Sequence, residues 1–135
     1  MLILDTLNKT TIWGGTRLQK FGSDPLEPHV GSLYTVAGNG ELSCMVLNGE
    51  YIGLTLYDVY RDNREMFGYD KYEPFPLLIG LVDATADLSI QIHPGDEYAR
   101  AHENAPFGKT ESWLFLEAPA SGSIVNGCKC QSRQE

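Results

Sequence analysis

The sequence is poor in basic residues, in cysteine and in long apolar runs, and each shortage argues against a class of protein. Ten Lys and Arg stand against 18 Asp and Glu, so the 135 residues carry a formal charge of −8. Because neutralising phosphates needs clustered positive charge, we expect no nucleic-acid partner. The longest strongly apolar stretch, Phe75–Val82, contains a proline and is too short to span a bilayer, so we expect no membrane partner.

The three cysteines, Cys44, Cys128 and Cys130, are too few and too odd in number for a disulfide framework. Reduced thiols in the cytoplasm are the simplest explanation. The start of the chain agrees, because Met1–Leu4 has no basic segment before its short apolar run and does not resemble a secretory signal. Cys128 and Cys130 could form half of a metal site, but free thiols on a polar tail are favoured.

Fourteen glycines and seven prolines interrupt the chain so often that short strands joined by turns are favoured over long helices. A first strand is expected within Leu2–Phe21, ending in a glycine turn at Trp13–Thr16. Further strands are predicted at His29–Ala37, Phe75–Asp83, Leu88–His93, Glu111–Leu116 and Ser123–Val125, the second of them buried on both faces. Short helices are predicted at Thr55–Phe67 and Asp96–Glu103. This pattern predicts a mainly β sandwich or barrel of the jelly-roll kind.

One polar pair follows from the alternation of apolar and polar residues in Leu88–His93. Period-two spacing sends Gln91 and His93 to the same face, and two residues along a strand advance about 6.6 Å. Two converging side chains could therefore reach one ion. The alternative, favoured on alternation alone, is that both residues lie on a solvated strand face.

A carboxylate follows at Glu111, at the start of an apolar segment. Carboxylate, imidazole and amide oxygen together suit a borderline divalent ion such as zinc. Lys109 lies two positions earlier on the same face and could bind an anionic substrate or transfer a proton. The competing interpretation of Lys109 is a solvated loop lysine.

Three blocks of the sequence resemble type I mannose-6-phosphate isomerases, a family of zinc-dependent enzymes with a cupin-like jelly roll. The blocks are IWGG at Ile12–Gly15, FPLLIGLVDATADLSIQIHPGDEYA at Phe75–Ala99 and GKTESWLFLEA at Gly108–Ala118. The resemblance implies that Gln91, His93 and Glu111 are zinc ligands and that Lys109 lies near the substrate. It also implies interconversion of mannose 6-phosphate and fructose 6-phosphate.

The resemblance further implies that the chain matches the N-terminal region of a family member, as an incomplete jelly roll over residues 1–127 followed by a polar tail at 128–135. The family's fourth zinc ligand, a histidine, and its catalytic arginine would lie beyond Glu135. A second hypothesis is therefore a truncated or degenerate cupin-like module that binds metal or a partner without catalysis. Unpaired strand edges would favour a homodimer.

Overall fold

The computed structural model describes residues 1–68, 74–125 and 127, and the chain divides into two compact units. Unit 1 is Met1–Ser89 and unit 2 is Ile90–Glu135. The predicted tail, with Cys128 and Cys130, lies outside the described residues. Within the described parts of both units, every helix is too short or too polar to cross a membrane.

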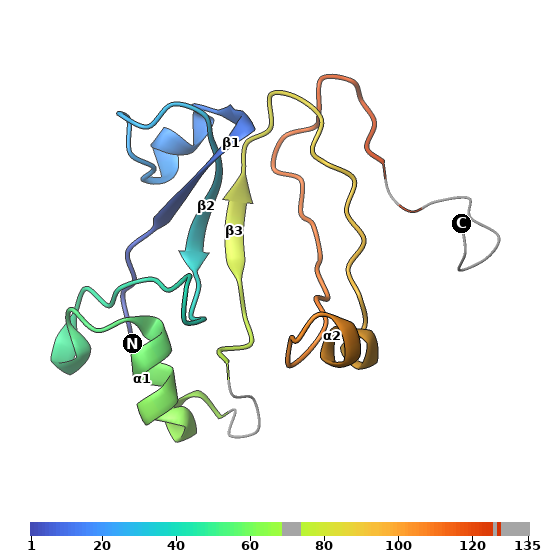
Figure 1. Cartoon of the computed structure of the whole chain (residues 1–135). Helices are drawn as coiled ribbons and strands as arrows, with labels where there is room; N and C mark the ends of the chain where they lie inside the picture. Colours follow the sequence, from blue (N-terminus) through green and yellow to red (C-terminus); the bar gives the residue numbers. More distant parts are fainter. Residues whose placement is uncertain (69–73, 126, 128–135) are drawn as a thin grey trace. The chain divides into compact units, whose positions relative to one another are not determined.

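Unit 1 is built on an antiparallel sheet of three strands, β1 (Leu7–Gly15), β2 (Val30–Val36) and β3 (Ile79–Val82). The strand order is β1-β2-β3, so β2 lies in the centre, as Figure 1 shows. Val30 and Leu33 of β2 are buried against Leu18, and Leu81 of β3 packs on the same cluster. The central strand, which is paired on both edges, therefore supplies two of the three buried residues of this cluster.

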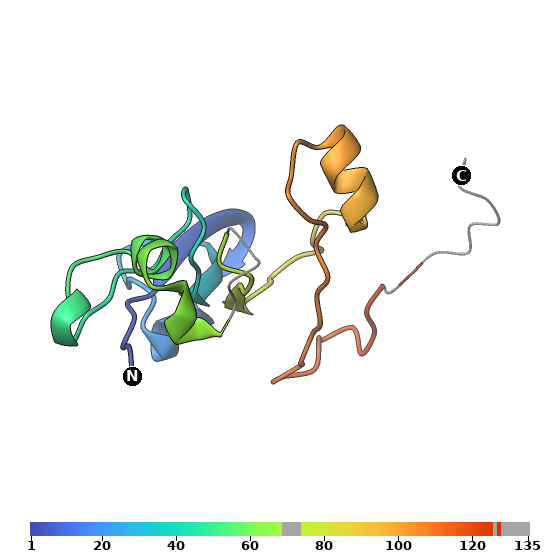
Figure 2. The same ribbon diagram turned by 90° about the horizontal axis from the view of Figure 1, so that it is seen from below.

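The helix predicted at Thr55–Phe67 is confirmed in two parts. Helix α1 (Leu56–Asp62) begins after Thr55, whose hydroxyl accepts a hydrogen bond from the backbone N–H of Asp58 at 3.1 Å. A 3₁₀ turn, η3 (Arg64–Phe67), continues it and ends at Gly68 in a left-handed conformation. The apolar stripe on α1 faces inward, and its buried members are Leu56, Val59 and Tyr60. Figure 2 looks at α1 from below.

An aromatic cluster joins the end of this helical segment to the chain that leads into β3. The rings of Tyr60, Phe67 and Phe75 contact one another edge to face, with centroids 5.3 to 5.9 Å apart. Such pairs contribute about 0.5–1.5 kcal/mol beyond the area that they bury. The cluster therefore fixes α1 against the approach to β3.

The glycine turn predicted at Trp13–Thr16 is wrong, because β1 continues through Gly15. Close packing requires glycine at this place, where the register of β1 against β2 shifts between Thr10 and Gly15. A Cβ added to Gly14 would clash with the backbone oxygen of His29. Gly14 therefore lets β1 approach the chain that leads into β2, and Gly15 leaves room for the side chain of Asp83. Glycines in a strand can have this packing role, although in sequence they look like a turn.

The expectation that Phe75–Asp83 is a strand buried on both faces is also wrong. Only Ile79–Val82 forms a strand, and Ile79 and Val82 remain 51% and 40% exposed. Among the described residues, β2 is the one strand that pairs with β3. A run of apolar residues indicates that a strand can be buried on both faces. Whether it is buried depends on other elements of the fold that pack against those faces.

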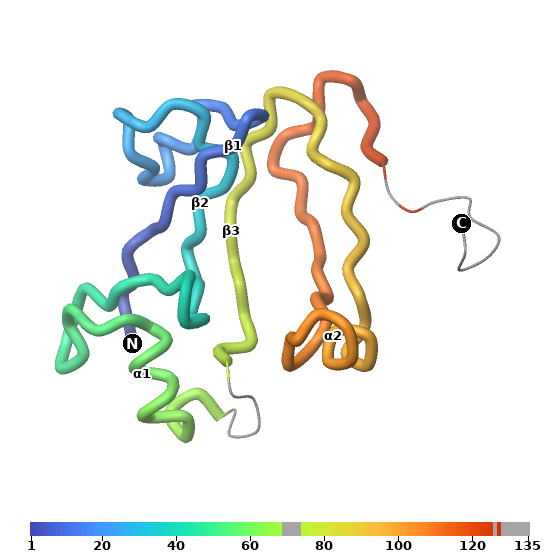
Figure 3. Tube along the Cα trace, viewed as in Figure 1, coloured from blue at the N-terminus to red at the C-terminus, as the bar shows by residue number. Residues whose placement is uncertain are grey.

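Unit 2 contains helix α2 (Asp96–His102) between two extended segments, which can be followed in Figure 3. The helix predicted at Asp96–Glu103 is thereby confirmed, with Gly95 as its N-cap. The strands predicted at Leu88–His93, Glu111–Leu116 and Ser123–Val125 are absent from the described residues as regular strands. Alternation predicts the two faces of a segment, whereas a strand also needs a hydrogen-bonded partner. The described chain is thus a small sheet with short helices.

Candidate active site

The four residues singled out from the sequence all belong to unit 2, on either side of α2. Gln91 and His93 precede the helix, whereas Lys109 and Glu111 follow it. The chain returns beside its own path at Gly108, whose backbone N–H donates a hydrogen bond to the Asp96 carboxylate at 2.9 Å. This return brings the segment after α2 close to the segment before it.

Glycine at position 108 is required by this close approach. A Cβ there would overlap the backbone oxygen of Pro94, well inside van der Waals contact. Gly108 therefore lets the two segments meet one residue after His93 and three residues before Glu111. The polar side chains of the two segments converge at that level.

The centre of the cluster is the carboxylate of Glu111. Lys109 Nζ lies 3.0 Å from Glu111 Oε2, and His93 Nε2 lies 3.4 Å from Glu111 Oε1. The indole Nε1–H of Trp113 donates to the same Oε1 at 3.0 Å. The structure thus brings together three of the four expected residues, His93, Lys109 and Glu111. The fourth, Gln91, occupies an exposed position two residues before His93.

These donors stabilise the ionised form of Glu111. The hydrogen bond from Lys109, then that from Trp113, and the nearby charges of Lys109 and His93 hold the pKa of Glu111 below its ordinary value. Partial desolvation acts in the opposite direction and is outweighed. The carboxylate is therefore an anion near neutral pH and available to a cation.

The spacing of donor atoms fits two adjacent ligands of a metal ion. Nitrogen and oxygen ligands at about 2.1 Å from a tetrahedral zinc ion lie about 3.4 Å apart. His93 Nε2 and Glu111 Oε1 are separated by 3.4 Å. In the described part of the chain, His, Cys, Asp and Glu side chains nowhere gather in threes. Among the described residues, a third ligand near this pair would therefore be a residue of another type, such as the amide of Gln91.

Trp113 is the member of this cluster that the sequence interpretation missed. The apolar character of Glu111–Leu116 assigns it only to an apolar strand face, together with Phe115. The same period-two spacing that joins Lys109 to Glu111 also places Trp113 on that side of an extended segment. Its indole N–H gives the ring a polar end as well as an apolar body.

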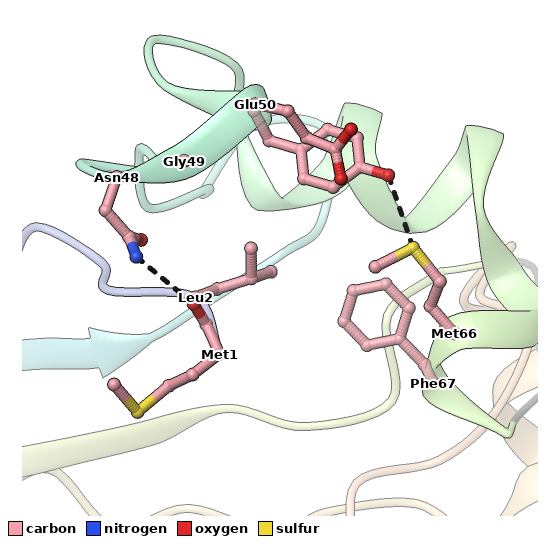
Figure 4. A pocket seen from close by; sticks show the side chains of 8 residues that line it. Met1, Leu2, Asn48, Gly49, Glu50, Met66 and Phe67 are labelled. Carbon is pink, nitrogen blue, oxygen red and sulfur yellow. Dashed lines mark hydrogen bonds between the residues drawn. The ribbon is translucent and has the colours of Figure 1, made fainter.

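Unit 1 contains an open pocket of about 360 Å³ that lies apart from these residues in sequence. Figure 4 shows its lining, which includes Met1, Leu2, Asn48, Glu50, Met66 and Phe67. Asn48 donates to the Met1 backbone oxygen at 3.2 Å, and the Tyr51 hydroxyl donates to the Met66 sulfur at 3.3 Å. The lining holds a single carboxylate, no histidine and no lysine, so its chemistry suits neither a metal ion nor an anion.

Comparison with known proteins identifies the family. Residues 1–111 match the family described as phosphomannose isomerase type I, catalytic domain. The chain is 38% identical over 127 residues to mannose-6-phosphate isomerase ManA of Bacillus subtilis, covering 94% of this chain and 40% of the relative. It is 37% identical over 135 residues to a mannose-6-phosphate isomerase of Streptococcus mutans, covering 99% and 42%.

The fold agrees with these relatives. The crystal structure of the mannose 6-phosphate isomerase from Bacillus subtilis superimposes with a TM-score of 0.74 at 35% identity, covering 79% of this chain and 34% of that one. The chain spans about two fifths of the length of the curated relatives that it matches. Sequence and structure thus agree, and the chain belongs to the type I phosphomannose isomerase family.

Proposed function

We propose that this chain contributes the active-site region of a zinc-dependent aldose–ketose isomerase that interconverts mannose 6-phosphate and fructose 6-phosphate. The observation that carries the proposal is the convergence of His93, Lys109 and Glu111 within a chain of this family. The relatives named above are mannose-6-phosphate isomerases, which supports a sugar-phosphate substrate. The sheet of unit 1 would be part of a cupin-like jelly roll.

His93, Glu111 and Gln91 would hold the metal, since an imidazole, a carboxylate and an amide oxygen are donors that zinc accepts. When bound, zinc would polarise the carbonyl and hydroxyl oxygens of the sugar. Aldose–ketose interconversion moves one proton between C2 and C1 and another between their oxygens. Both transfers pass through negative charge on oxygen, so fixed positive groups near those oxygens lower the barrier.

Lys109 would be the catalytic residue that supplies such a group from this chain. Its ammonium is fixed by Glu111 at 3.0 Å while its side chain remains 51% exposed and can reach a substrate. A local cation matters because the chain as a whole carries −8 and repels a phosphate dianion at long range. Beyond roughly 8 Å that repulsion is screened at physiological salt, so the nearby ammonium dominates.

The test measures zinc content and turnover of fructose 6-phosphate by the 135-residue chain. Glu111→Gln removes the ligand charge with little change of shape, and Glu97→Gln makes the same change at an exposed position on α2. Stoichiometric zinc and turnover in the wild type and in Glu97→Gln, with loss of both in Glu111→Gln, would support the isomerase. Zinc without turnover would instead support a metal-binding module without catalysis. A folded chain with neither would reject the site.

A further inference from the structure

The two oxygens of the Glu111 carboxylate have different neighbours. Oε2 accepts from Lys109 at 3.0 Å, whereas Oε1 accepts from Trp113 Nε1 at 3.0 Å and faces His93 Nε2 at 3.4 Å. A carboxylate oxygen has two lone-pair directions, so Oε1 can accept one hydrogen bond and still bind an ion. The indole therefore contacts the same oxygen atom that faces the imidazole.

We propose that Trp113 is a positioning residue, which holds Glu111 Oε1 toward His93 in the orientation that a divalent cation requires. This inference rests on the function proposed above, because it gives Trp113 a role toward that metal site. A group that hydrogen-bonds to a metal ligand fixes the ligand's orientation, and its loss costs about 10- to 100-fold in metal affinity.

The chemistry of the indole suits this role better than that of the other donor. An indole nitrogen donates and cannot accept, so Trp113 does not compete with Glu111 for a cation. Its rigid plane turns about two side-chain torsions, whereas the lysine side chain has a flexible four-carbon stem. Trp113 is 54% exposed, and its indole N–H nevertheless has a defined acceptor in Glu111 Oε1 at 3.0 Å.

The first experiment observes the hydrogen bond itself. The chain has two tryptophans, Trp13 in unit 1 and Trp113 in unit 2, so a ¹⁵N-labelled Trp13→Phe chain retains a single indole N–H signal. Adding Glu111→Gln replaces a charged acceptor by a weaker neutral one, and we expect the indole proton signal to shift upfield. Adding Glu97→Gln should leave it in place. An indole signal that Glu111→Gln does not move would overturn the proposal.

The second experiment measures zinc affinity by competition with a chromophoric chelator. Trp113→Phe removes the N–H and keeps an aromatic ring, and we expect zinc binding to weaken by about 10- to 100-fold. Trp13→Phe makes the same chemical change in unit 1 and should keep the wild-type affinity. Equal affinities in the two variants would refute a positioning role. If zinc binds equally to wild type and Glu111→Gln, the proposed metal site fails, and the indole signal alone decides whether Trp113 positions Glu111.

Discussion

The stability of unit 1 depends on a buried carboxylate, that of Asp83, at the end of β3. The Asp83 side chain is 1% exposed. Its Oδ1 accepts a hydrogen bond from Arg17 Nε at 2.7 Å, and Arg17 Nη2 lies 2.7 Å from the same oxygen. Oδ2 accepts from the backbone N–H of Arg17 at 2.8 Å. The guanidinium side of the pair is more exposed to solvent, since the Arg17 side chain is 57% exposed. The pair is therefore asymmetric in burial.

This asymmetry predicts which partner is more costly to remove. Arg17→Met leaves the buried charge with its backbone donor alone, and breaking a buried pair in this way costs about 3–5 kcal/mol. Because water reaches the arginine side, we expect the lower end, about 3 kcal/mol. Asp83→Asn keeps the shape and one acceptor oxygen, and the exposed arginine regains water, so the loss is the net contribution of the Arg17–Asp83 side-chain hydrogen bonds, about 1–2 kcal/mol. Arg17→Met should therefore be the more destabilising change.

Urea unfolding in a Trp113→Phe background measures this difference, because Trp13 then reports on unit 1 alone. The Trp13 backbone oxygen accepts from Thr85 at 2.8 Å, two residues after Asp83. If the dependence of the unfolding free energy on urea concentration is the same in each variant, the shift of the urea midpoint gives the change in unfolding free energy. Lys9→Met also removes one positive charge, at an exposed position on β1, and should change stability by less than about 0.5 kcal/mol. If Asp83→Asn proved the more destabilising change, the number of hydrogen bonds lost would predict the stability better than the burial of the partner left behind. The burial argument would then be refuted.

Three further predictions concern the packing of unit 1 and the charge cluster of unit 2. Gly14→Ala should destabilise unit 1 by at least about 1–3 kcal/mol, because the added Cβ would meet the backbone of the neighbouring segment. Gly40→Ala, whose added Cβ would have its nearest neighbour 4.0 Å away, should be tolerated in the same urea assay. Cys44 is fully buried, and burial raises the pKa of its thiol. Iodoacetamide should therefore alkylate Cys44 only after unfolding, as measured by mass spectrometry, and rapid labelling of the native chain would contradict this. The Glu111 carboxylate, whose pKa is lowered, should stabilise the fold above its unfolded pKa and lose this contribution as pH falls through the folded value. In a ¹³C NMR titration, Lys109→Met should raise the midpoint of Glu111, and an unchanged midpoint would contradict the ion pair.

Local chemistry made several features predictable. Helix α1 follows from the capping threonine and the spacing of its apolar residues, and the glycine after η3 ends the helical segment. Period-two spacing likewise placed Lys109 and Glu111 on one side of an extended segment. The exposure of β3 was not predictable, because an apolar run looks the same whether or not another layer covers it. The role of Gly14 was missed for a similar reason, since close packing and turning both require glycine.

The sequence by itself determined the family, through three blocks in order, and the residue types of the candidate site. It also determined which side chains share a face, because side-chain direction along a strand depends on parity alone. Only the tertiary structure decided that His93 and Glu111 meet at 3.4 Å and that Trp113 donates to the same carboxylate oxygen. The physical reason is that such distances depend on how closely two segments pack, which in unit 2 is set by the missing side chain of Gly108.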